Sequence, residues 1–239
     1  MSARITIVKT GEPVPFVQET RGQFADLIRE AIGPVWPGAY EVFDARTDDY
    51  PHPKGSSAFI ITGSAANVPN REAWMLRAEA WLRDVASAGT PTFGICFGHQ
   101  ILAQALGGEV IKNPSGREIG TTTIEVTEDD PIFAALPASF SANVTHIDTV
   151  GKLPPGARSL ARSSRDDNQA IRFTETCWGV QFHPEIDAGV MRHYVEARRE
   201  ILTTEGFLVD AVLAEIGAGE QGREALRSFV KHAVLPHEG

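Results

Sequence analysis

The chain has 239 residues, of which 42% are hydrophobic and 22% charged, an ordinary balance for a globular protein with a sizeable core. Its formal net charge is -9, and no run of Lys or Arg offers the clustered cations that bind nucleic-acid phosphates. No apolar run approaches the ~18 residues of a membrane-spanning helix, and the apolar stretch at the N-terminus is too short for a signal peptide. We therefore expect one cytoplasmic domain over residues 1–239, with a small molecule or a protein as partner and neither nucleic acid nor membrane.

The first half of the sequence alternates between strand-like and helix-like segments. β-branched or continuously apolar runs predict strands, and apolar residues spaced three and four apart predict helices. In chain order, the sequence predicts strands at 5–8, 40–45, 58–62 and 92–95, and helices at about 16–31, 70–88 and 97–106. Because strands that alternate with helices form a mainly parallel sheet covered on both faces, we expect an α/β fold.

The pattern changes after Gly108. Short extended runs at 109–111, 121–126, 141–145 and 159–162 are separated by Gly, Pro and Asp and predict antiparallel additions to the sheet. Segments 169–173 and 177–182 predict a hairpin whose second strand ends at His183-Pro184-Glu185, because proline blocks further pairing.

The residues from Asp187 onward predict two or three helices. They form a C-terminal helical extension, about 187–239, after a core of about 5–186. We expect Arg192, Arg198 and Arg199 in the first of these helices to lie on a solvated face.

Cys96 is the candidate nucleophile. It lies in Gly94-Ile95-Cys96-Phe97-Gly98, between a buried strand and a helix, where flanking glycines are typical of a sharp turn that exposes the central residue. A helix N-terminus also favours the reactive thiolate. The alternative is that Cys96 is a small buried hydrophobe, which is how we interpret Cys177 inside a predicted strand.

His183 and Glu185 are the candidate partners of that cysteine. A cysteine nucleophile needs an imidazole base within reach and a third group that orients the imidazole. The strand end places both side chains at the rim of the sheet, where the turn around Cys96 also emerges. Together with His146 and Asp148 they suggest an alternative, a metal cluster, but the tight two-histidine spacing of such sites is missing, and we expect neither metal nor cofactor. His99, beside the turn, is expected to pack against it.

Gly-Ile-Cys-Phe-Gly-His-Gln (94–100) and Gly-Val-Gln-Phe-His-Pro-Glu (179–185) together resemble the two signature segments of class-I glutamine amidotransferases. The similarity is greatest to stand-alone relatives of the GMP synthase amidotransferase domain and runs from about Ile5 to about Glu185. The resemblance implies a flavodoxin-like domain that hydrolyses a γ-glutamyl amide such as glutamine through a thioester on Cys96 and releases ammonia.

The resemblance also implies the remaining site residues. The oxyanion hole is expected from the backbone N–H of Phe97 and an N–H of the loop after the third strand, at Ser64. Gly63, Gln100, His146 and Asp148 occupy substrate-binding positions of the family. This chain departs from its relatives at Gly63-Ser64-Ala65, where they often have Gly-Gly-Pro, and at Ile147, where they tend to have glycine. The departures leave the identity of the substrate open.

No Gly-rich phosphate-binding loop of the G-x-x-x-x-G-K type accompanies the site, so this chain is not expected to aminate an acceptor by itself. Three hypotheses follow from the sequence. The first is a subunit that hands ammonia to a separate synthetase, and the second is a self-sufficient γ-glutamyl hydrolase or peptidase. The third is a catalytically silent binding protein that has kept the fold.

Overall fold

The computed structural model describes residues 3–237, in which eleven strands form two sheets. The strands are β1 (Arg4–Lys9), β2 (Ala39–Asp44), β3 (Ala58–Ile61), β4 (Thr92–Ile95), β5 (Glu109–Lys112), β6 (Glu118–Val126), β7 (Ser139–His146), β8 (Asp148–Lys152), β9 (Arg158–Arg162), β10 (Ala170–Arg172) and β11 (Cys177–Val180). The main sheet has the order β2-β1-β3-β4-β11-β10-β9-β6-β7, and β5 pairs with β8 in a small second sheet. The first five strands in this order are parallel and the others pair antiparallel, which confirms the expected α/β fold with antiparallel additions.

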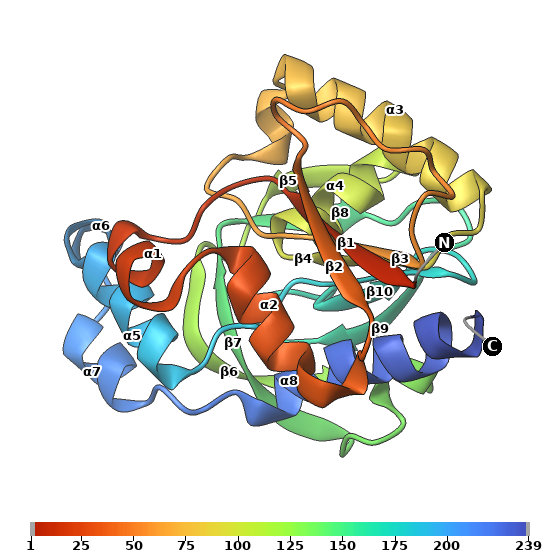
Figure 1. Ribbon diagram of the computed structural model, residues 1–239. Coiled ribbons are helices and arrows are strands. Elements are labelled where there is room, and N and C mark those ends of the chain that lie inside the picture. The colour runs from red at the N-terminus through yellow and green to blue at the C-terminus, as the bar shows by residue number, and fades with distance from the viewer. Residues whose placement is uncertain (1–2, 238–239) are drawn as a thin grey trace.

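Helices cover both faces of the main sheet (Figure 1). They are α1 (Pro15–Arg21), α2 (Phe24–Ile32), α3 (Ala73–Ser87), α4 (Phe97–Ala105), α5 (Ala188–Ala197), α6 (Arg199–Thr204), α7 (Val209–Ala214) and α8 (Glu220–Phe229). Helices α3 and α4 pack on one face, and α2 and α8 pack on the other. Figure 1 shows α5, α6 and α7 grouped beside α1, away from the outer strand β2.

The central strands are apolar on both sides because each face of the sheet has its own core. Ile60 of β3 packs in the core shared with α2 and α8, whereas its neighbour Ile61 packs in the core shared with α3 and α4. Strand side chains alternate between faces, so a strand buried on both faces reads as a continuous apolar run. This explains why residues 58–61 lack a polar alternation.

The helix predicted around residues 16–31 is wrong as a single element, because the chain forms α1 and α2 with a break at Gly22. Gly22 has φ 87, a left-handed conformation that favours glycine and ends α1. Helix α2 then starts at Gln23, whose backbone N–H donates to the Asp26 carboxylate at 2.8 Å and whose carbonyl accepts the Asp26 N–H at 2.9 Å.

The C-terminal segment differs from the prediction of two or three helices, because four α-helices lie between residues 188 and 229. A π-helical turn at Val230–Val234 and a 3-10 turn at Leu235–His237 follow them. Gly206 separates α6 from α7 and Gly219 precedes α8, with φ of 88 and 67. The strand β8 was not predicted, and it begins directly after β7.

Helix α8 belongs to the centre of the molecule. Its Leu226 and Phe229 are fully buried between the sheet and α2, and the Phe229 ring lies 5.1 Å from that of Phe93 in β4. Burying two large apolar side chains of this kind stabilises the fold by about 2 kcal/mol each. Among the described helices, none is both long and apolar enough to cross a membrane.

Candidate active site

Three neighbouring strand ends bring the predicted residues together. Strands β3, β4 and β11 are adjacent and parallel, so their carboxyl ends meet at one edge of the sheet. Gly63-Ser64 follows β3, Cys96 follows β4, and His183 comes shortly after β11. The backbone N–H of Cys96 donates to the Val180 carbonyl at 2.8 Å, which fixes the cysteine beside the segment that carries His183.

Cys96 has the strained backbone expected of a nucleophile at a sharp turn. Its φ is 51 and its ψ is -102, a conformation that L-residues rarely adopt. A Cβ on Gly94 would lie 2.5 Å from the carbonyl carbon of Gly98, and a Cβ on Gly98 would lie 2.5 Å from the Ile61 carbonyl oxygen. Both flanking glycines are therefore required by the close approach of backbone.

His183 and Glu185 form a buried pair beside Cys96. The Nδ1 atom of His183 lies 2.8 Å from Oε1 of Glu185 and donates to it, since an ionised carboxylate only accepts. This bond leaves Nε2 for the thiol, and among residues 3–237 Nε2 has no other hydrogen-bond partner.

Charge favours a thiolate and an imidazolium at this site. Burial raises the pKa of Cys96, but His183 and, to a smaller extent, His146 together more than offset it and hold the pKa below the ordinary thiol value. Burial lowers the pKa of His183, yet the charges of Glu185 and Cys96 raise it to about 10. Burial raises the pKa of Cys177, which lies fully buried in the core beside α3 and α4, as expected.

Two cavities meet at Cys96. The larger, about 220 Å³, is lined on its far side by the 12–15 loop, Phe24, His183 and Tyr194. The smaller, about 80 Å³, is lined on its far side by Asn67, Phe97, Gln100, Arg117 and the segment 146–148. Residues that line both are Ser64, Ala65, Cys96, Thr145 and Arg198. Cys96 therefore borders both cavities.

The predicted substrate-binding residues Gln100, His146 and Asp148 lie together on the smaller cavity. The Gln100 amide donates at 2.9 Å to the Asp148 carbonyl, and the Asn67 amide donates at 2.8 Å to the Asp148 carboxylate. Gly63 lies elsewhere, behind His183, where an added Cβ would be 3.1 Å from the imidazole Cε1 atom. Ile147 also lines the smaller cavity. The family resemblance gives glycine at this position, so isoleucine makes the cavity narrower.

His146 carries a positive charge in this arrangement. Its Nε2 lies 3.0 Å from the Glu118 carboxylate and its Nδ1 lies 3.0 Å from the Asp148 carbonyl, two acceptors that require a proton on each nitrogen. Burial lowers the pKa of His146, but the bond to Glu118 and the charge of Asp166 raise it above its ordinary value. Glu118 was not among the predicted site residues, because its only signal is its place directly opposite His146 in the pairing of β6 with β7.

His99 is fully buried beside the turn around Cys96, 5.7 Å from the ring of Phe173. Burial lowers the pKa of His99 to about 3, so the ring is neutral and packs against its neighbours instead of acting as a second base. Within residues 3–237, no three His, Cys, Asp or Glu side chains are grouped so as to hold a metal ion.

The fold and this site define an α/β protein with a buried cysteine at a strand–helix turn, beside a histidine–glutamate pair. The chain belongs to the class-I glutamine amidotransferase family, whose model matches residues 49–200. This match confirms the family that the two signature segments indicated.

Two relatives carry the name of a glutamine-hydrolysing GMP synthase. The enzyme of Aeropyrum pernix is 32% identical over 205 residues, which cover 83% of this chain and 37% of that protein. One separately encoded subunit of the enzyme of Methanopyrus kandleri is 31% identical over 169 residues, which cover 70% of this chain and 87% of that subunit. The chain thus spans well under two thirds of the full-length GMP synthase but most of the separate subunit.

A solved structure of a glutamine amidotransferase from Thermotoga maritima has the same fold. Its TM-score is 0.75 at 24% identity, and the match covers 97% of this chain and 98% of that one. The fold therefore extends over the C-terminal helices, which the sequence resemblance did not include.

Proposed function

We propose that this protein hydrolyses the side-chain amide of a γ-glutamyl compound, glutamine or a close relative, through a thioester on Cys96. The observation that carries the proposal is the strained turn at Cys96 beside the buried His183–Glu185 pair. The family to which the chain belongs supports the reaction class.

In the first step the Cys96 thiolate attacks the amide carbonyl carbon and forms a C–S bond. Nε2 of the His183 imidazolium then gives its proton to the amide nitrogen, the C–N bond breaks, and ammonia or an amine leaves. Water completes the reaction when His183 takes one of its protons and the oxygen attacks the thioester. The C–S bond breaks, glutamate leaves, and the thiolate is restored.

The oxyanion that forms in each step would accept hydrogen bonds from the backbone N–H groups of Phe97 and Ser64. Phe97 is the first residue of α4, where the N–H has no carbonyl in a preceding turn. Ser64 lines both cavities at Cys96, and its hydroxyl is engaged elsewhere, because it donates to the Thr10 carbonyl at 2.9 Å and accepts the Ala66 N–H at 3.1 Å. The main chain of Ser64 is therefore the part left for the oxyanion, and each such donor contributes about 3 kcal/mol to the transition state.

In this proposal residues 1–239 act as one domain, since α8 completes the core behind β4. Because the chain is similar to a separately encoded GMP synthase subunit over most of that subunit, one role is to supply ammonia to a synthetase on another chain. A second role is favoured by the cavity of about 220 Å³ beside His183, which is lined by the 12–15 loop and Tyr194 of the same chain. That space accommodates a leaving group larger than ammonia, as a self-sufficient γ-glutamyl hydrolase requires.

The test is mass spectrometry after incubation with a diazo-ketone analogue of glutamine, on wild type and Cys96→Ala. We expect a single adduct on Cys96 in wild type and none in the variant, with Cys177 unmodified in both. Ammonia release from L-glutamine then separates the roles, because a subunit that waits for a synthetase is slow alone. An unmodified Cys96 that nevertheless reacts with iodoacetamide would contradict a γ-glutamyl site, and a Cys96 as inert as Cys177 would indicate the silent binding protein.

A further inference from the structure

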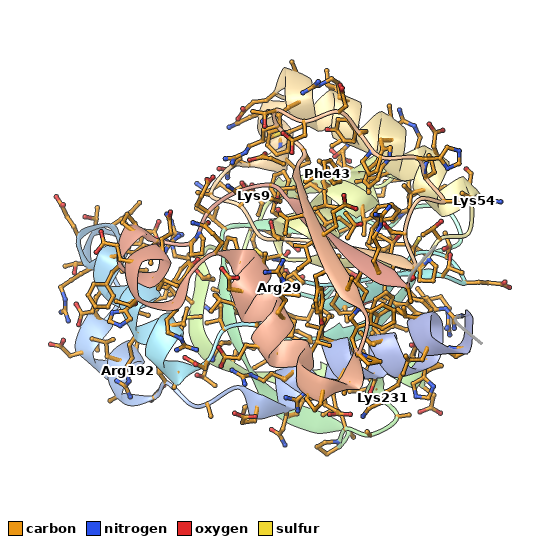
Figure 2. The ribbon with its side chains drawn as sticks, viewed as in Figure 1. Lys9, Arg29, Phe43, Lys54, Arg192 and Lys231 are labelled. Carbon is orange, nitrogen blue, oxygen red and sulfur yellow. The ribbon has the colours of Figure 1, made fainter. Side chains whose placement is uncertain are left out.

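Arg198 lines both cavities at Cys96, although the sequence placed it on a solvated face. That expectation is wrong for Arg198 because it is the residue at which α5 ends and α6 begins, with φ -111 and ψ 10. The break turns its side chain toward the site. Arg192 of α5 instead donates to the Leu213 carbonyl of α7 at 2.7 Å, on the outer side of the molecule (Figure 2). Arg199 pairs with Glu196 and Asp210 at the surface.

Arg198 forms no ion pair with a carboxylate in the part of the chain that the structure describes. Its guanidinium stacks over the Tyr194 ring, 4.9 Å from the ring centroid, and its one hydrogen bond is a long contact of 3.4 Å to the Tyr194 carbonyl. The neighbouring Arg117 differs, because its guanidinium donates to both oxygens of Glu205 at 2.7 and 3.0 Å. Burial lowers the pKa of Arg198 and the positive charge of Arg117 lowers it further, while Tyr194 and Cys96 raise it without restoring the ordinary value. Leaving a half-buried cation unpaired costs free energy, which a bound anion would recover.

We propose that Arg198 binds the α-carboxylate of the substrate, so that the C-terminal helices supply a specificity-determining residue of the site. The inference rests on the proposed function, because every γ-glutamyl compound carries this carboxylate at the end of its acyl chain away from the scissile amide. A guanidinium binds a carboxylate through two parallel hydrogen bonds, and the Tyr194 ring holds it in place before substrate arrives. Arg198 borders the space of both cavities next to the Cys96 sulfur, as this role requires.

The kinetic test compares wild type, Arg198→Gln and Arg198→Lys with Arg192→Gln as matched control on the preceding helix. The substrates are L-glutamine and γ-aminobutyramide, which lacks the α-carboxylate. We expect Arg198→Gln to lose about 10–100-fold in kcat/KM on glutamine, mainly through KM, with Arg198→Lys intermediate and Arg192→Gln unchanged. On γ-aminobutyramide, Arg198→Gln should match wild type. Equal losses on both substrates would overturn the proposal.

A carboxylate on the leaving group is the other anion that Arg198 could meet. γ-Glutamylglycine has such a carboxylate and glutamine does not. A loss in Arg198→Gln that is confined to γ-glutamylglycine would therefore overturn the assignment to the α-carboxylate, whereas similar losses on both substrates support it.

A second readout does not depend on γ-glutamyl turnover. The rate of Cys96 alkylation by iodoacetate, divided by the rate with neutral iodoacetamide, reports attraction of an anion to the thiolate. We expect this ratio to fall about 10-fold in Arg198→Gln and to stay unchanged in Arg192→Gln, since His183 and His146 are common to all the proteins. An unchanged ratio in Arg198→Gln would refute the anion-binding role. Failure of the proposed function would look different: wild type would still show a higher iodoacetate-to-iodoacetamide ratio than Arg198→Gln, but the glutamine analogue would leave no adduct on Cys96.

Discussion

The Nδ1 atom of His183 and the Oε1 atom of Glu185 lie 2.8 Å apart, and both side chains are buried. In such a position the carboxylate keeps a proton on Nδ1 and turns Nε2 toward Cys96. It also raises the pKa of His183, so that the imidazole is protonated when it meets a leaving group. Two consequences, one kinetic and one in pH dependence, follow from removing this charge.

Glu185→Gln should lower kcat about 10²–10⁴-fold, because the amide orients the ring less well and no longer stabilises its charge. The pKa of His183 should fall from about 10, since the charge of Glu185 is the largest single cause that raises it. The basic limb of the pH profile of kcat/KM therefore moves to lower pH. Glu196→Gln, at a surface pair with Arg199, serves as control. A basic limb that stays in place would show that another group sets it.

Gly94→Ala should destabilise the fold by about 3 kcal/mol, because the new Cβ would meet the Gly98 backbone at 2.5 Å and neither chain segment can move. Gly116→Ala is the control, since its Cβ would have open space and only the positive φ of 79 adds strain, about 1 kcal/mol. Urea unfolding followed by circular dichroism measures both. Equal costs at the two positions would mean that the turn around Cys96 is more adaptable than its packing suggests.

The parts of the site that the sequence predicts are those encoded by neighbouring residues. The glycines around Cys96 and the His183-Pro184-Glu185 segment are local patterns, and the structure brings these two segments together at one sheet edge. Glu118 was missed because its contact with His146 depends on the register between two strands. Arg198 was missed because a helix pattern does not show the break at which its side chain turns inward.

The burial of His99 predicts a specific acid sensitivity. Its folded-state pKa of about 3 lies below the ordinary value of 6.5, so the unfolded chain binds a proton that the folded chain excludes. The contribution of neutral His99 to the free energy of unfolding is fully present above about pH 6.5. It is lost as pH falls toward 3, at up to about 1.4 kcal/mol per pH unit.

His99→Gln should therefore show a shallower loss of stability between pH 6.5 and 4 than wild type, although its absolute stability at pH 7 is also lower. The slope is measured from urea midpoints at several pH values, with the exposed His52→Gln as control. Parallel slopes in wild type and His99→Gln would assign the acid sensitivity to other groups.

The buried pair of Glu118 and His146 links stability to the reactivity of Cys96. Glu118→Gln removes the carboxylate that is hydrogen-bonded to the His146 imidazolium and leaves only Asp166, at 3.8 Å, to balance its charge, which should cost about 3–5 kcal/mol in the free energy of unfolding. Glu125→Gln on the same strand, at an exposed pair with Arg162, should cost about 0.5 kcal/mol or less.

The same substitution should change the reactivity of Cys96. The pKa of His146 falls in Glu118→Gln, and the positive charge of His146 is one of those that lower the pKa of Cys96. The midpoint of Cys96 alkylation by iodoacetamide should therefore move to higher pH in Glu118→Gln and stay in place in Glu125→Gln. A stability loss without this shift would make Glu118 a structural residue alone.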